Sequence, residues 1–435
     1  MKYAEEMKDI TNAFKNSPLE DGELKRFYCD GTMEFRTGDK YESPTQDIYE
    51  ACQVPSGQNA FLLLGHKGCG KSTELNKMSV ELMKAGYYVF TISCINNSDI
   101  LKLTYTDLLI LLGEALLKIA DKSDCHLHER IKKQLISFWT SDMEEERSIT
   151  GSSDISAEAG IQAESPKFLS AILQVFANIK ADLKYSEERR TTYRQKIRRY
   201  SSEWLVMLRE IADEITKKLN GKQPIIIFED LDKIDARVAW DVFGNYAATL
   251  TGVSFPIIYT FPIALSYDPR FAALEGYFIP KTLPMIKQET INGETFQKGI
   301  DIIVKIIEKR AKLDLFEEHV LETLIKKTGG SLRDLFYAIN ASAQRAIRRD
   351  SDTISTEDIQ RALEELKTSL TRRIERKHYQ FLRDIYEGNR QIIEDKNMLL
   401  EMLEANAVLE YNGKRWHNVH PLVSDFLLEQ GIIKK

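Results

Sequence analysis

The residues most clearly suited to chemistry lie in one glycine-rich segment. Gly65 and Gly70 are separated by four residues, and Lys71 and Ser72 follow directly. Glycines at this spacing let backbone N–H groups surround phosphate oxygens at a helix N-terminus, while the lysine reaches the terminal phosphates and the hydroxyl ligates Mg²⁺. The pattern predicts a P-loop that binds a nucleoside triphosphate. Its expected contact residues are Gly65, His66, Lys67, Gly68, Cys69, Gly70, Lys71, Ser72 and Thr73.

Acidic residues follow an apolar run further along the chain, where a triphosphatase needs carboxylates. Ile225 to Phe228 is apolar, and Glu229, Asp230 and Asp232 come directly after it. One carboxylate holds Mg²⁺ together with the P-loop hydroxyl, and another orients the attacking water. We expect Glu229 and Asp230 in these roles, with Ser72, Glu229 and Asp230 around the metal. A shifted register, with Asp230 on the Mg²⁺ side and Asp232 assisting, stays open.

Five short apolar runs predict the elements that position these residues. Each has the length and composition of a buried strand, and helical stretches separate them, as in a parallel α/β sheet. The P-loop directly follows the first run and opens a helix. The runs are 60–64, 87–93, 224–228, 256–261 and 277–283.

The chain divides into four predicted parts. Residues 1–59 are an N-terminal segment leading into the core, and 60–290 form the P-loop core, with a helical insertion at about 121–205. A Ser/Gly/Ala-rich stretch at 148–165 predicts a mobile loop in that insertion. Residues 291–370 read as a helical lid domain. In 371–435, helices precede two strand-like runs joined by Asn412-Gly413, a turn-forming dipeptide, which predicts a winged helix.

The order of these features resembles AAA+ ATPases, most closely the origin-recognition initiator branch and the related STAND switch ATPases. It also resembles a broad group of bacterial ATP-binding proteins. Beyond the P-loop and the acidic strand end, the resemblance rests on Thr260 near a strand end, Asp268-Pro269-Arg270, and the Gly-Gly-Ser-Leu-Arg-Asp run from Gly329 to Asp334.

The resemblance implies roles for three further side chains. Thr260 matches the polar sensor that contacts the γ-phosphate and the water, and Arg333 matches the lid arginine that senses the nucleotide. Arg270 lies where an arginine finger acts on a neighbouring subunit, which implies a homo-oligomer. The alternative for Thr260 is an ordinary β-branched strand residue, and the alternative for Arg333 is a charge on a helix surface. The order Glu229-Asp230 departs from the commoner Asp-Glu, which changes the reach of both carboxylates and predicts slow hydrolysis.

The composition excludes several classes of protein. The chain has 435 residues, and 60 Lys and Arg against 66 Asp and Glu give a net charge of −6, which does not suit a protein covered in nucleic-acid-binding surface. Its apolar runs fall short of the ~18 residues of a membrane span. The N-terminus lacks the apolar core of a signal peptide, and the five cysteines contain no Cys-x-x-Cys pair. We expect a cytoplasmic protein that does not enter membranes.

Two regions could contact DNA. The stretch 180–199 is the most basic, and Arg190, Arg194 and Arg198 recur every four residues on one predicted helix face. This face could meet phosphates or an acidic partner, or it is an ordinary solvated helix face. The predicted recognition helix of the winged helix, 395–405, is acidic. A phosphate backbone would repel it, so contact with protein is favoured over contact with DNA.

The leading hypothesis is an AAA+ or STAND-like switch that binds ATP and Mg²⁺, hydrolyses ATP slowly and regulates a partner protein or assembly. The resemblance also associates such ATPases with bacterial antiviral defence. One alternative is a DNA-binding initiator or loader that acts through its winged helix and basic insertion. Another is a nucleotide-binding scaffold without turnover.

Overall fold

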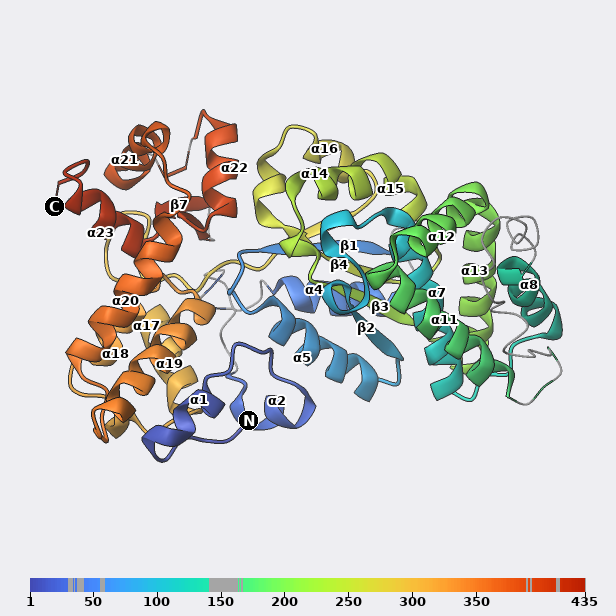
Figure 1. The fold of residues 1–435 in the computed structure, drawn as a ribbon, viewed down its shortest axis with the longest axis horizontal. Helices are drawn as coiled ribbons and strands as arrows, with labels where there is room; N and C mark the ends of the chain where they lie inside the picture. Colours follow the sequence, from blue (N-terminus) through green and yellow to red (C-terminus); the bar gives the residue numbers. More distant parts are fainter. Residues whose placement is uncertain are drawn as a thin grey trace.

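A five-stranded parallel sheet forms the centre of the protein, as a computed structural model shows (Figure 1). The strands are β1 (Ala60–Gly65), β2 (Val89–Ser93), β3 (Ile225–Glu229), β4 (Ile257–Pro262) and β5 (Ile279–Thr282). The structure describes residues 1–29, 34, 36, 43–54, 59–140, 163, 165, 167–388, 390–391, 393–411 and 415–434. The predicted α/β fold class with a parallel sheet is confirmed.

The strand order places the chemistry at one edge of the sheet. Across the sheet the order is β2-β3-β4-β1-β5, and every neighbouring pair is parallel. All six residues of β1 are buried, which fits a central strand covered on both faces. Since the carboxyl ends of parallel strands meet at one edge, the P-loop after β1 lies near the acids after β3 and Thr260 in β4.

Helices cover the sheet, and a block of further helices lies on one side of it. Alongside the strands run α4 (Pro44–Gln53), α5 (Lys71–Lys84), α6 (Cys94–Asn97), α14 (Ala236–Ala239), α15 (Asn245–Leu250) and α16 (Phe271–Leu274). A helical block follows β2 and contains α7 (Tyr105–Lys122), α8 (Glu129–Thr140), α11 (Phe168–Tyr185), α12 (Glu187–Arg199) and α13 (Ser201–Lys218). Its apolar interior is continuous with that of the sheet. Most of the predicted loop at 148–165 lies outside the described residues.

Two smaller units lie at the other end of the molecule (Figure 1). The predicted lid contains α17 (Gln297–Glu308), α18 (Val320–Lys327), α19 (Leu332–Arg348) and α20 (Thr356–Thr371). The C-terminal unit contains α21 (Tyr379–Glu387), α22 (Lys396–Glu404), the antiparallel strands β6 (Val408–Tyr411) and β7 (Trp416–Val419), and α23 (Pro421–Glu429). Its winged-helix character stays a prediction, and the Asn412-Gly413 turn lies outside the described residues.

The N-terminal segment packs on the lid as well as on the core. Apolar residues of α1 (Ile10–Ala13) and its surroundings share one buried cluster with the lid helices, and Ala4 forms a parallel bridge with Ala311. Further along, α2 (Asp21–Phe27) packs beside α5. The segment therefore joins core and lid. No helix of the described parts is long and apolar enough to cross a membrane.

We expect Gly113→Ala to lower the melting temperature, although alanine is the better helix former. Gly113 lies inside α7, where a Cβ atom would overlap the ring of the fully buried Trp204. Alanine gains about 1 kcal/mol of helix propensity, whereas overfilling a packed core costs about 1–3 kcal/mol. Calorimetry should therefore show a net loss. Gly22→Ala in α2 is the matched control, because nothing lies within 4 Å of its Cβ position. An unchanged Gly113→Ala protein would contradict this packing.

Candidate nucleotide-binding site

The P-loop connects the end of β1 to the start of α5. Gly68 and Gly70 have φ angles of 96° and 101°, in the left-handed region that favours glycine, and Gly70 is the N-cap of α5. The N–H groups of the first helical turn have no partners within the helix. The loop thus has the conformation that the glycine pattern predicts, with α5 presenting its N-terminus to the pocket.

The ammonium of Lys71 is buried and fully coordinated by the protein. Its Nζ donates to the carbonyl oxygens of Gly65 and His66 at 2.7 and 2.9 Å, and it lies 2.8 Å from Oδ2 of Asp232. Burial lowers the pKa of Lys71, but the attraction of Asp232 outweighs it, so the pKa lies above its usual value. Asp232 is thus the counter-ion of the P-loop lysine.

Glu229 lies beside the P-loop hydroxyl. Burial raises the pKa of Glu229 to about 7, although a hydrogen bond from Ser72 acts against this shift. Its Oε1 atom is buried and has no hydrogen-bond partner among the described residues. The contact with Ser72 favours the register with Glu229, and not Asp230, on the Mg²⁺ side.

Asp230 points away toward the end of β2. It adopts a left-handed conformation with φ of 72°, and its Oδ2 accepts a hydrogen bond from the Ser93 hydroxyl at 2.5 Å. Its Oδ1 accepts one from Lys233 Nζ at 2.6 Å. The three acids after β3 therefore have three different environments.

Thr260 holds the turn that carries these acids. Its hydroxyl accepts a hydrogen bond from the Leu231 amide at 3.0 Å and donates one to the Phe228 carbonyl at 3.3 Å, and the residue is 1% exposed. These bonds join β4 to β3. The expected contact of Thr260 with a γ-phosphate stays a prediction.

The lid contacts the P-loop directly. The amide of Leu332 donates to the carbonyl of Gly68 at 3.2 Å, and a Cβ at Gly68 would lie 2.8 Å from both Arg333 Cβ and Ser331 Oγ. Ser331 caps α19 by accepting a hydrogen bond from the Asp334 amide. The N-termini of α5 and α19 therefore meet at this loop, and Arg333 lines the same pocket.

Arg270 does not line the pocket. Its guanidinium bonds to Asp268 at 2.6 and 2.9 Å and lies 4.4 Å from the ring centre of Trp240. The side chain is 65% exposed. A role toward a neighbouring subunit stays a prediction.

Three predicted contact residues within the P-loop differ in their surroundings. His66 is 1% exposed, and its Nε2 accepts a hydrogen bond from the Glu410 amide at 2.8 Å, so its ring faces the C-terminal unit and not the pocket. Cys69 is fully buried. Burial lowers the pKa of Lys67, which lies among several charged groups that include Asp232.

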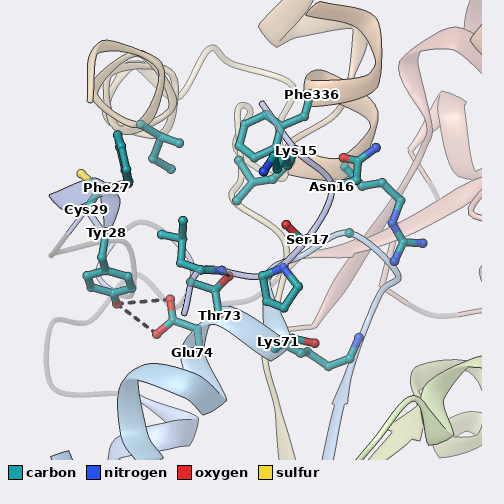
Figure 2. Close-up of a pocket in the computed structure, with 18 of the residues that line it drawn as sticks. Lys15, Asn16, Ser17, Phe27, Tyr28, Cys29, Lys71, Thr73, Glu74 and Phe336 are labelled. Carbon is teal, nitrogen blue, oxygen red and sulfur yellow. Dashed lines mark hydrogen bonds between the residues drawn. The ribbon is translucent and has the colours of Figure 1, made fainter. Parts of the chain in front are cut away.

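The N-terminal segment supplies much of the pocket wall, and no sequence pattern predicts this. Figure 2 shows Lys15, Asn16 and Ser17 between the P-loop and Phe336 of the lid. Tyr28 donates to the carboxylate of Glu74 in the first turn of α5. Other lining residues outside the sequence motifs are Pro18, Leu19, Phe27, Cys29, Arg36, Ile306 and Arg310. No local motif marks these positions.

The basic helix α12 turns two arginines of its predicted face inward. Arg190 is buried and pairs with Asp99 at 3.1 Å, and Arg194 forms a bidentate pair with Asp107 at 2.5 and 2.8 Å. These pairs attach α12 to the residues that follow β2. The phosphate-binding interpretation of Arg190 and Arg194 is therefore wrong, because protein carboxylates already hold both guanidinium groups.

No family model matches this sequence, and no curated protein matches it. Among solved structures, the chain is similar to the Walker-type ATPase of Pyrococcus abyssi, with 14% identity over 96% of this chain and 99% of that one, and a TM-score of 0.47. It is also similar to Cdc6p from Pyrobaculum aerophilum, with 13% identity, 97% and 99% coverage and a TM-score of 0.40. The ORC2 protein of Aeropyrum pernix gives 13% identity, 97% coverage of both chains and a TM-score of 0.38. Similarity at this level does not identify an activity.

We expect Glu229→Gln to change how stability depends on pH. Since folding raises the pKa of Glu229 to about 7, the folded protein keeps a proton that the unfolded chain releases near pH 4.5. The free energy of unfolding therefore falls as pH rises between these values and levels off above them. At about 1.4 kcal/mol per pKa unit, this change is on the order of 2 kcal/mol for a partly accessible group.

Urea unfolding of both proteins at pH 5 and pH 8, without nucleotide or Mg²⁺, measures the effect. Relative to wild type, the free energy of unfolding of Glu229→Gln should be higher at pH 8 than at pH 5. Glu318→Gln is the control, because the Glu318 side chain is 89% exposed. Identical pH dependence of wild type and Glu229→Gln would contradict the raised pKa.

Proposed function

We propose that this protein binds ATP with Mg²⁺ between the sheet edge and the lid, hydrolyses it slowly, and uses the cycle to switch conformation and regulate a partner. One observation supports this most strongly: a P-loop with a buried, charged lysine lies directly against the N-terminus of a lid helix. Two helix N-termini and the Lys71 ammonium together favour a polyphosphate ligand.

Lys71 is the residue that would change partner on binding. A phosphate oxygen would compete with Asp232 for its ammonium, so the ion pair would exchange for a contact with the ligand. Asp232 would then lose its counter-ion while 8% exposed. This loss limits affinity and also transmits the presence of phosphate to the turn after β3.

Ser72 and Glu229 suit a Mg²⁺ ion. A hydroxyl and a carboxylate are hard oxygen ligands, and Glu229 Oε1 is buried without a partner among the described residues. The described residues contain no group of three or more His, Cys, Asp or Glu that would hold a metal alone. Mg²⁺ of this kind takes its other ligands from phosphate and water. When bound, it neutralises phosphate charge.

Asp230 is the candidate to orient the attacking water. Ser93 and Lys233 both donate to its carboxylate, so two of the lone pairs of Asp230 are already used and fewer are left to orient a water molecule. Its side chain is also one methylene shorter than the glutamate common in related sites. Both features favour slow turnover.

The contacts around the P-loop suit a switch. Gly68 bonds to Leu332 of the lid and His66 bonds to Glu410 of the C-terminal unit, while the Tyr411 hydroxyl joins that unit to the lid by donating to the Gly329 carbonyl at 2.7 Å. A change in the conformation of the loop on phosphate binding would therefore alter the contacts that hold the lid and the C-terminal unit against it. Regulation of a partner protein, a homo-oligomer built through Arg270, and a place in antiviral defence extend this proposal on the resemblance alone.

The two alternatives predict different behaviour. A DNA-binding initiator would need a basic surface, yet Arg190 and Arg194 form ion pairs with carboxylates of this chain. A non-hydrolysing scaffold would bind ATP and leave it intact.

We expect Lys71→Ala to abolish ATP binding, because it removes the charge that the P-loop places at the phosphates. Isothermal titration with ATP and Mg²⁺ should show at least a 100-fold loss of affinity. Lys84→Ala, at the exposed end of the same helix, should bind like wild type. Equal ATP affinity of Lys71→Ala and wild type would contradict the assignment of the P-loop as the ATP-binding site.

We expect Asp230→Asn to bind ATP within a few-fold of wild type and to lose most of its turnover, because an amide orients water without accepting its proton. Phosphate release at saturating ATP is the measurement. Equal turnover of wild type and Asp230→Asn would remove Asp230 from the mechanism. Binding without any turnover in wild type would favour the scaffold.

A further inference from the structure

Arg36 is a buried arginine inside the nucleotide pocket. It is 1% exposed, and it lines the pocket together with Lys71, Ser72 and Arg333. No carboxylate pairs with it among the residues that the structure describes. Proteins rarely bury a charge without a partner, because removal from water penalises the charged form. A positive charge held in this way suits an anion that arrives from outside the chain.

The hydrogen bonds of Arg36 leave one edge of the guanidinium facing the loop. Nη1 donates to the carbonyl of Pro284, just beyond β5, at 2.6 Å. Nε is buried and has no partner among the described residues. Nη2 lies against the P-loop, since a Cβ at Gly70 would be 3.4 Å from it.

The edge formed by Nε and Nη2 has the geometry that binds two oxygens at once. Nε and Nη2 point in parallel, and other arginines of this protein use the same pair of atoms. Arg194 holds Asp107 through Nε and Nη2, and Arg349 holds Asp358 in the same way at 3.1 and 2.6 Å. A phosphate presents oxygens at a spacing similar to that of a carboxylate.

We propose that Arg36 is a phosphate-binding residue, which donates from Nε and Nη2 to the nucleotide held by the P-loop of the same chain. This inference rests on the proposed function. It adds a cation from the segment before β1 to Lys71 and Arg333, which the sequence motifs indicate. The Pro284 carbonyl positions this cation by holding Nη1.

The test compares Arg36→Met and Arg36→Lys with wild type. Thermal unfolding without nucleotide reports the cost of the buried charge, and titration with AMP, ADP and ATP in Mg²⁺ reports the phosphate contact. Arg36→Met keeps the length of the side chain and removes the charge. We expect it to melt at the same or a higher temperature than wild type without nucleotide, and to bind ATP about 10- to 100-fold more weakly.

Arg36→Lys keeps the charge without the two-pronged edge, so it should recover part of the affinity. AMP binding should change least, because the P-loop holds the distal phosphates. A loss for both ADP and ATP places the contact on a phosphate that both share, whereas a loss for ATP alone places it on the γ-phosphate. Arg361→Met, an exposed lid arginine, is the matched control.

Wild-type ATP affinity in Arg36→Met would overturn the inference while leaving the proposed function in place. If that variant also melts at a lower temperature than wild type without nucleotide, Arg36 is structural. If Arg36→Met fails to fold, Arg36→Lys with unchanged affinity for all three nucleotides and an unchanged shift of melting temperature on ATP binding would also contradict it. A wild-type protein that binds no nucleotide would instead refute the proposed function.

Discussion

The burial of one ammonium group constrains the whole carboxyl edge of the sheet. Lys71 is 5% exposed on its side chain, and an ion so far from water needs close compensation. Two carbonyls of the P-loop provide part of it, and Asp232 provides the charge. Asp232 reaches Lys71 because Asp230 turns the chain through a left-handed conformation and Thr260 holds the next amide. One continuous set of polar contacts therefore joins the lysine, the turn after β3 and the strand β4.

The parts that the sequence predicted are those written in contiguous patterns. A glycine loop between an apolar run and a helix needs only its neighbours to adopt its shape, and all five predicted strands are present. The roles of Glu229, Asp230 and Asp232 could not be separated in advance. Three acids within four residues differ only in direction, and that direction depends on one left-handed residue and on Ser93 and Thr260 from other strands.

Contacts between distant segments account for what the sequence did not predict. The backbone makes part of the attachment of the N-terminal segment to α5, since the Leu19 amide donates to Thr73 and its carbonyl accepts from Asn76, and side chains such as Tyr28 make the rest. Backbone contacts impose no side-chain pattern, and the partners of the side chains lie far along the chain, so the sequence predicts only a lead into the core for this stretch. The prediction of a phosphate-binding face at Arg190 and Arg194 was wrong for a related reason. Their spacing shows that they share a face, but it carries no information on the carboxylates that meet that face.

The ring of His66 gives the phosphate loop a second attachment, outside the sheet and the lid. A residue inside the binding loop packs into the C-terminal unit, where the backbone of Glu410 holds it. The conformation of the loop therefore depends in part on a contact with residues more than three hundred positions away in the chain. A fragment cut after α20 would contain every element of the nucleotide motif and still lack a support of its loop. Activity measured on such a fragment would describe a different loop from that of the whole chain.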